Sequence, residues 1–351
     1  MRLEHAQIRN FKAIRELSLS LLTTRGDPRP LTLLLGDNGS GKTTALQAIA
    51  LTLSLATRRI SAPAGLDWQG FLAERVGSLG PSRVALDVCF EDEELKTTRN
   101  LFDTWIAQQP LELQHRFAAP GDMKRVELIY EKGALFSPQG PGAISQFLGR
   151  HFIRDLSKTN EAARDSFSQI GDVFWFDQNR NPTTTGAELA WDMGINRLRS
   201  ELIQWYAYHT SRRVIPANDY LQKLEDMFAR FFPGARFVGI EPREVFALGD
   251  FESYFLIQRG DRVYDIAEMS SGEQAIFPLL HEFARRSIAR SVVLIDELEL
   301  HLHPPLQQML LSALRTIGPD CQFIVTTHSP YLEEATPDEF EIRLPGGRRC
   351  L

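Results

Sequence analysis

The chain has 351 residues, 43% of them hydrophobic and 24% charged, a balance that excludes a disordered protein and allows one large core or two smaller ones. The net charge of -6 and the pI near 5.8 exclude an overall positive field, so any contact with nucleic acid must be local. The three cysteines lack paired spacing, no apolar signal segment is visible, and the apolar runs are shorter than a membrane span. We therefore expect a cytoplasmic protein without a disulfide framework, a zinc site or a membrane partner.

The first part of the chain predicts two strands, a glycine-rich loop and a helix. Residues 5–14 alternate between apolar and polar side chains, as a half-buried strand does. Residues 31–35, LTLLL, predict a second strand, which leads directly into the sequence GDNGSGKTT. Apolar residues then recur at helical spacing over residues 45–59.

From about residue 61 prolines and glycines interrupt the regular patterns. Residues 82–92 and 124–135 predict an antiparallel pair of strands with a long excursion between them. The segments that follow predict a mostly helical run to residue 168, an aromatic strand at 172–180, helical stretches at 187–213 and 218–232, and a small sheet at 234–263.

The last part of the chain predicts an alternation of strands and helices. In MSSGEQ, residues 269–274, Glu273 and Gln274 each fall three residues after a serine, which is the spacing of a capping box at a helix start. The elements expected after this helix are a strand at 291–295, a helix at 304–317, a strand at 321–325 and a short strand at 341–345. Strands alternate with helices at both ends of the chain, which predicts a mainly parallel sheet with the middle of the chain inserted.

The sequence GDNGSGKT fits the P-loop pattern G-x-x-x-x-G-K-[ST] and stands between an apolar strand and an apolar helix, as that motif requires. Its glycines allow backbone N–H groups to face phosphate groups, and the helix N-terminus adds a favourable dipole. We expect Lys42 to pair with the β- and γ-phosphates of ATP and the Thr43 hydroxyl to ligate Mg²⁺. The residues expected to bind the nucleotide in this loop are Gly36, Asn38, Gly39, Gly41, Lys42, Thr43 and Thr44.

Two later apolar strands lead into polar residues. Asp296 and Glu297 follow SVVLI, and the carboxyl ends of parallel strands meet at the ligand crevice, so we expect Asp296 near Mg²⁺ and Glu297 beside the attacking water. His328 follows CQFIV, 32 residues after Asp296 (328 − 296), which allows one crossover to a neighbouring strand. We expect His328 to hydrogen-bond the γ-phosphate or the water. Taken alone, an acidic pair after a strand also suits a helix start, and a single histidine suits a surface position.

Together these motifs resemble the ATP-binding-cassette (ABC) superfamily, in the non-transport branch that includes SMC, RecF and the OLD-family ATPases. The resemblance implies an α/β fold: a P-loop NTPase with an ABC-ATPase head, a mixed sheet, an antiparallel β subdomain and a helical signature lobe. MSSGEQ resembles the ABC signature, whose helix points its N-terminus at the γ-phosphate held by a second copy. The resemblance therefore implies a homodimer that closes on ATP, with the signature residues Ser270, Ser271, Gly272 and Glu273 at the nucleotide.

Other segments match the same branch. IRNFKAI has Asn10, Phe11 and Lys12 at the N-F-[KR] positions of RecF-like ATPases, and LHLH at 300–303 takes the place of the D-loop. Gln178 in FWFDQNR is the candidate Q-loop glutamine, a ligand of Mg²⁺ and a contact of the attacking water. The implied domain order is residues 1–60 with the P-loop, 61–170 as an inserted β/helical subdomain, 171–270 with the Q-loop and helical lobe, and 271–351 with the signature helix, the acidic motif, the D-loop and the switch histidine.

The resemblance also implies a function, an ATPase that gates a separate effector. Stand-alone ATPases of this kind are similar to the ATPase subunits of bacterial defence systems such as Septu and retrons, where a neighbouring gene supplies a nuclease or toxin. OLD nucleases continue past the switch histidine into a Toprim nuclease domain, whereas 23 residues follow His328 here (351 − 328). We therefore expect the nuclease or toxin to be a separate protein.

Two other functions are considered. One is a RecF-like DNA clamp, in which Arg285, Arg286 and Arg290 of the signature helix reach phosphate, although such arginines are more often a solvated face. The other is a transporter subunit. It is disfavoured by the 228 residues between Lys42 and Ser270 (270 − 42) and by the LHLH sequence.

Overall fold

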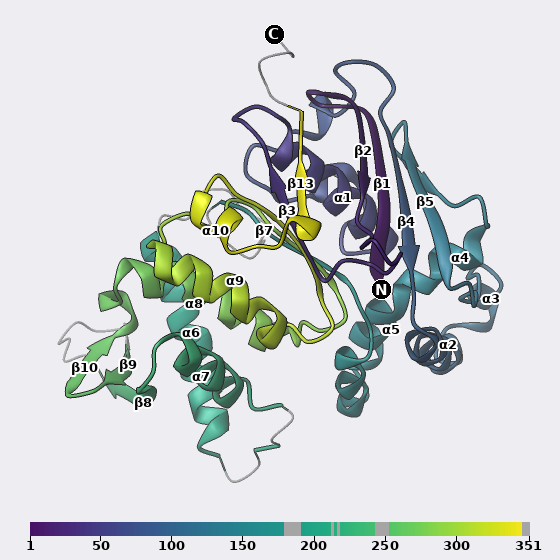
Figure 1. Ribbon diagram of the computed structural model, residues 1–351. Helices are drawn as coiled ribbons and strands as arrows, with labels where there is room; N and C mark the ends of the chain where they lie inside the picture. Colours follow the sequence, from purple (N-terminus) through teal and green to yellow (C-terminus); the bar gives the residue numbers. More distant parts are fainter. Residues whose placement is uncertain (179–190, 212–213, 216–217, 243–252, 346–351) are drawn as a thin grey trace. The chain divides into compact units, whose positions relative to one another are not determined.

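A computed structural model describes residues 1–178, 191–211, 214–215, 218–242 and 253–345 (Figure 1). The chain divides into two compact units. The first comprises Met1–Thr183, Ile288–Leu300 and Leu314–Leu351, and the second comprises Thr184–Ser287 and His301–Ala313. The chain therefore passes from the first unit into the second and back again on two occasions.

The first unit contains a five-stranded sheet in which all neighbouring strands are parallel, in the order β13-β3-β12-β11-β7. Its strands are β3 (Leu31–Leu35), β7 (Val173–Phe176), β11 (Val292–Ile295), β12 (Gln322–Thr326) and β13 (Glu341–Arg343). Every residue of β7, β11 and β12 is buried, as expected for parallel strands covered on both faces. The prediction of a mainly parallel sheet is confirmed. The aromatic strand predicted at 172–180 is present as β7 at one edge of the sheet, and residues 179–180 lie outside the described residues.

The second sheet of this unit is antiparallel, in the order β2-β1-β4-β5-β6. Its strands are β1 (Arg2–Phe11), β2 (Ile14–Ser20), β4 (Arg83–Cys89), β5 (Arg125–Glu131) and β6 (Ala134–Phe136). The pair predicted at 82–92 and 124–135 is confirmed as β4 and β5. The strand predicted over 5–14 is confirmed as β1 for residues 5–11, but its predicted end is wrong. The chain turns there from β1 into β2, and Asn10 and Lys12 take left-handed φ angles of 49° and 50° in the turn.

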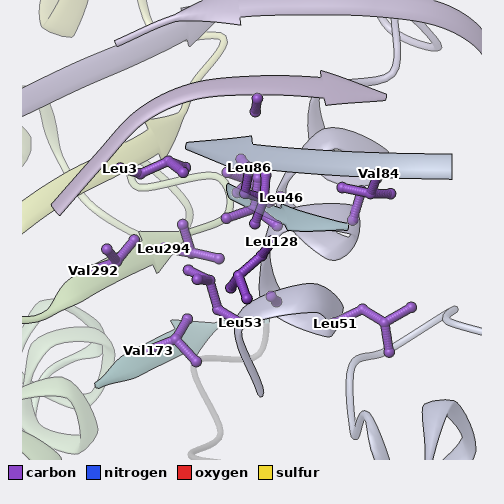
Figure 2. Close-up of a cluster of buried hydrophobic side chains, with 14 of the residues drawn as sticks. Leu3, Leu46, Leu51, Leu53, Val84, Leu86, Leu128, Val173, Val292 and Leu294 are labelled. Atoms are coloured by element: carbon purple, nitrogen blue, oxygen red, sulfur yellow. The ribbon is translucent and has the colours of Figure 1, made fainter. Parts of the chain in front are cut away.

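Helix α1 (Lys42–Ala56) packs against both sheets (Figure 2). Leu46, Leu51 and Leu53 of the helix share one buried cluster with Leu3, Val84, Leu86 and Leu128 of the antiparallel sheet and Val173, Val292 and Leu294 of the parallel sheet. A helix covered on two sides needs apolar residues around most of its circumference, which is why most residues of α1 are buried. This packing holds the start of α1 at the end of β3.

Further helices complete the first unit. Its helices are α2 (Asp92–Ile106), α3 (Leu111–Gln114), α4 (Pro141–Ser145), α5 (Gly149–Leu156) and α10 (Pro330–Glu334). Phe102 and Trp105 of α2 pack against Phe152 of α5 in a second apolar cluster. The short 3-10 helices of the described chain include Pro63–Gly65, Ala73–Arg75, Gln146–Leu148, Glu161–Ser168, Ile266–Glu268 and Asp338–Phe340.

The second unit combines helices with a three-stranded antiparallel sheet in the order β10-β9-β8. Its elements are α6 (Trp191–His209), α7 (Tyr220–Phe231), β8 (Ala235–Pro242), β9 (Ser253–Arg259), β10 (Arg262–Asp265) and α8 (Ser271–Arg286), and α9 (Pro304–Ile317) begins in this unit and ends in the first. The rings of Phe228, Phe237, Phe255 and Phe277 contact one another and form its core. The small sheet predicted at 234–263 and the helix predicted from MSSGEQ are confirmed.

None of the helices in the described parts of the chain combines the length and the apolar character that a bilayer crossing requires.

Candidate functional site

The loop between β3 and α1 adopts a conformation that depends on glycine. Gly36, Gly39 and Gly41 have φ angles of 150°, 79° and 96°, which side chains other than glycine rarely tolerate. Gly41 is the N-cap of α1, and a Cβ atom there would lie 3.1 Å from Cγ1 of Ile14. Asn38 and Gly39 are exposed at the tip of the loop. The backbone therefore curls around the helix start, where N–H groups lack helical partners.

The side chains of this loop suit a bound polyphosphate. Lys42 Nζ donates to the carbonyl oxygens of Gly36 and Asp37, at 2.8 and 3.1 Å. Burial lowers the pKa of Lys42, and the nearby charges of Asp296 and other carboxylates act against that shift. Within the described residues, the buried Ser40 hydroxyl has no hydrogen-bond partner. The Lys42 ammonium group donates to neutral carbonyl oxygens, and the Ser40 hydroxyl has no partner among the described residues. The oxygens of a bound phosphate would accept hydrogen bonds from both groups.

Thr43, in the first turn of α1, contacts Asp296, the residue that follows β11. Its hydroxyl lies 3.0 Å from both carboxylate oxygens of Asp296. Asp296 is 1% exposed, and Oδ1 also accepts a 2.6 Å hydrogen bond from the Thr326 hydroxyl. Burial raises the pKa of Asp296, while the bonds from Thr326 and Thr43 lower it. A hydroxyl and a carboxylate are hard oxygen ligands, so this pair fits Mg²⁺ that also binds phosphate. Thr44 follows Thr43 on α1 and is half-buried.

Glu297 stands next to this pair in a left-handed conformation, with φ of 48°. Its backbone N–H donates to the Thr326 hydroxyl at 2.8 Å, and its Oε1 accepts a 2.9 Å hydrogen bond from Nε2 of Gln178, just past the end of β7. Burial, together with the charges of Asp296 and Glu299, raises the pKa of Glu297. The structure thus brings Gln178 and Glu297 together at adjacent strand ends.

His328 lies beyond the end of β12 and is exposed. A charge on His328 acts to lower the pKa of Glu297. The backbone N–H of His328 donates to Glu299 Oε1 at 2.6 Å, and the Thr327 hydroxyl donates to Glu299 Oε2 at 2.7 Å. Sequence reasoning missed Thr326 and Glu299. Their only signal was their position beside the two strand-end motifs.

The four signature residues begin helix α8 in the second unit. Ser270 is the N-cap, and a capping box joins it to Glu273, as predicted from the spacing. The Ser270 hydroxyl and its backbone N–H both donate to Glu273 Oε2 at 2.7 Å. Ser270 and Ser271 are exposed, whereas Gly272 and Glu273 are buried. The Glu273 side chain is therefore engaged inside the cap, where Tyr264 Oη also donates to it at 2.7 Å.

The arginines considered for a DNA contact are engaged with carboxylates. Arg285 and Arg286 both form ion pairs with Glu282, which is 2% exposed. The prediction that Arg290 lies on the signature helix is wrong, because α8 ends at Arg286. Arg290 instead forms an ion pair with Glu93 at 3.2 Å, within the first unit.

A P-loop helix buried between a parallel and an antiparallel sheet, with acidic and polar residues at adjacent strand ends, defines a P-loop fold of the kind found in Smc head domains. Two solved structures have the same fold. The chain matches "Crystal structure of the SmcHead bound to the C-winged helix domain of ScpA" with a TM-score of 0.54 and 15% identity, covering 96% of this chain and 92% of that one. An Smc head domain described as derived from Pyrococcus furiosus matches with a TM-score of 0.50 and 14% identity, covering 95% and 92%.

The chain belongs to the family described as "AAA domain, putative AbiEii toxin, Type IV TA system", whose model matches residues 153–333, more than half of the chain. A second AAA-domain model matches residues 6–109. The predicted resemblance to this branch of ATPases is confirmed.

Curated relatives include the Septu protein PtuA of Bacillus mycoides, 23% identical over 93% of this chain and 38% of that protein. The "Retron Ec83 probable ATPase" of Escherichia coli is 28% identical over 44% of this chain and 28% of its own length. The "Retron Vc95 probable ATPase" of Vibrio cholerae is 34% identical over 25% and 19%. The matched segments thus span between about a fifth and two fifths of these relatives.

Proposed function

We propose that this chain binds ATP with Mg²⁺ and hydrolyses it at the end of the parallel sheet. The observation that carries the proposal is the 2.9 Å hydrogen bond between Gln178 and Glu297, beside the contact of Thr43 with Asp296. A carboxylate with a raised pKa, held next to a hydroxyl–carboxylate pair, suits a base that accepts a proton from water near a metal-bound phosphate.

Each side chain has a distinct role in this proposal. Bound ATP supplies the phosphoryl group, and bound Mg²⁺ neutralises charge on its oxygens. Lys42 and the loop N–H groups bind the phosphates, while Thr43 and Asp296 hold the metal ion, with the Gln178 amide oxygen as a further ligand. Glu297 accepts the proton of the attacking water, which Gln178 orients, and His328 donates a hydrogen bond to the γ-phosphate or to the water.

The proposal extends to a homodimer closed by ATP and to a separate effector. Ser270 and Ser271 are exposed at the start of α8, where the helix dipole and N–H groups favour an anion. A partner copy could therefore present this helix start to the γ-phosphate. The similarity to Septu and retron proteins supports a role in a bacterial defence-type system in the cytoplasm, in which hydrolysis gates a nuclease or toxin supplied by another protein.

The alternative, a RecF-like clamp on DNA, has less support. Its candidate arginines are paired with Glu282 and Glu93. A DNA affinity that falls steeply with salt would favour the clamp, because phosphate contacts release counterions. An affinity that does not change with salt would exclude it.

The proposed activity is tested by ATP turnover and by binding of a fluorescent ATP analogue. We expect Lys42→Ala to lose both, and Glu297→Gln to lower kcat by about 100-fold or more while binding is retained. Glu16→Gln, at an exposed carboxylate on β2, is the matched control and should leave both unchanged. Unchanged turnover in Glu297→Gln would contradict the proposed base. Co-purification of the tagged chain with a second polypeptide from its native host tests the effector.

A further inference from the structure

Glu299 connects the two strand-end segments that carry the proposed catalytic side chains. It lies in the turn after β11, three residues beyond Asp296, and the turn is closed by a 3.0 Å bond from Leu300 N–H to the Glu297 carbonyl. Its carboxylate crosses to the segment after β12. No P-loop or signature motif includes this residue.

Both oxygens of the Glu299 carboxylate are used in this contact. Oε1 accepts the His328 backbone N–H at 2.6 Å, and Oε2 accepts the Thr327 hydroxyl at 2.7 Å. The Thr327 oxygen in turn accepts the Ser329 N–H at 3.0 Å, and Ser329 is the N-cap of α10. One carboxylate thus fixes, directly or through Thr327, the backbone on both sides of the exposed His328 imidazole.

We propose that Glu299 is a positioning residue for ATP hydrolysis, which holds the segment 327–329 so that the His328 imidazole is directed at the reacting phosphate. The inference rests on the proposed function. It concerns a step after nucleotide binding, because Lys42 and Thr43 bind the phosphates and metal ion through other contacts. Removing the carboxylate should therefore slow turnover without weakening ATP binding.

The first test separates kcat from KM in purified full-length variants. The variant Glu299→Gln keeps the size of the side chain, but it replaces one acceptor oxygen with an NH₂ group, which cannot accept a hydrogen bond from Thr327 or His328. We expect Glu299→Gln and Thr327→Val to lower kcat by about tenfold with KM within about twofold of wild type, and Thr327→Ser to restore turnover. Glu225→Gln is the matched control, because Glu225 also accepts a backbone N–H, from Phe237 at 2.6 Å, but in the second unit. It should leave kcat unchanged.

A double-mutant cycle tests whether Glu299 acts through His328. If it does, Glu299→Gln combined with His328→Ala should turn over ATP at the rate of His328→Ala alone, within about twofold. Independent, multiplicative losses would overturn the inference.

Amide hydrogen exchange of the nucleotide-free protein gives a readout that does not depend on activity. Faster exchange in residues 327–329 of Glu299→Gln is expected, because the Gln side chain keeps one acceptor oxygen for the two donors, the His328 N–H and the Thr327 hydroxyl. If His328→Ala is impaired but Glu299→Gln is not, the inference fails while the proposed function stands. If the wild-type chain hydrolyses no ATP, both fail.

Discussion

The glycines of the P-loop differ in what a side chain would meet. Gly39 has φ of 79° with open space around it, whereas at Gly41, with φ of 96°, a Cβ would press on Ile14. Gly39→Ala should therefore cost only the left-handed strain, about 1–2 kcal/mol, and Gly41→Ala should cost that and a displaced Ile14. We expect thermal unfolding and ATP-analogue titration to show larger losses for Gly41→Ala. A larger loss for Gly39→Ala would contradict this order.

The hydroxyl oxygen of Thr326 takes part in two hydrogen bonds at the candidate site. Its hydroxyl donates to Asp296 and accepts the N–H of Glu297, so it holds the Asp296 carboxylate and the left-handed turn together. Thr326→Val should leave the Glu297 N–H without its acceptor, which costs about 1–3 kcal/mol of unfolding free energy and lowers turnover. Thr326→Ser keeps the hydroxyl and should remain close to wild type in urea unfolding and in turnover. Equal losses in the two variants would contradict the role given to the hydroxyl.

The residues that could be found from sequence are those with a fixed place in a local pattern. Lys42 follows its glycines at a set spacing, and Asp296 and His328 follow apolar strands. Thr326 and Glu299 could not be found in this way. Their partners lie 30 and 29 residues away in the chain, and the contacts depend on the register in which β11 and β12 pair.

At the scale of the element, helix α8 carries a buried carboxylate whose charge is compensated on the same helix. Burial acts to raise the pKa of Glu282, but contact with His281 and the charges of Arg286 and Arg285 outweigh it and lower the pKa to about 2, from 4.5. A carboxylate with a depressed pKa adds stability above its unfolded pKa, and that stability is lost as pH falls through the folded pKa.

Glu282→Gln should therefore destabilise the protein most at neutral pH, by about 2 kcal/mol, because the two arginines lose their common partner. The difference from wild type in unfolding free energy should shrink as pH falls from 4.5 towards about 2. Urea unfolding at a series of pH values measures this difference. A deficit that stays constant down to the lowest accessible pH would mean that packing, and not charge, is responsible.

Elements differ in how completely the sequence predicts them. The start of α8 was predictable because a capping box is a local pattern of side chains and adjacent N–H groups. The turn between β1 and β2 was not, because residues 5–14 keep alternating across it. The break depends on two non-glycine residues, Asn10 and Lys12, in left-handed conformations, which neither residue type requires.

At the scale of the whole molecule, the second unit interrupts the parallel sheet in sequence. Strands β7 and β11 are hydrogen-bonded neighbours, yet Thr184–Ser287 lies between them in the chain. The neighbouring strands bring Gln178 beside Glu297, while the intervening segment forms its own aromatic core and presents Ser270. In sequence order, Gln178 and the proposed base Glu297 thus stand on either side of the signature helix.

ATP-dependent association of two copies is therefore the most direct test of the proposed homodimer. Glu297→Gln, which should bind but not hydrolyse ATP, is expected to double its mass in light scattering when ATP and Mg²⁺ are added. Ser270→Arg in the same background should remain monomeric, because a bulky cation replaces the hydroxyl that caps α8 and would meet the γ-phosphate.

The controls separate binding from association. Lys42→Ala should prevent both, whereas Ser270→Arg should still bind the fluorescent ATP analogue, because in the proposed dimer Ser270 contacts the nucleotide of the partner copy and not its own. Loss of the N-cap should lower the unfolding free energy of Ser270→Arg by only about 1 kcal/mol, so unfolding does not explain a failure to dimerise. A Glu297→Gln chain that binds ATP and stays monomeric at every protein concentration would contradict the homodimer, and Ser270 would then have no phosphate to contact.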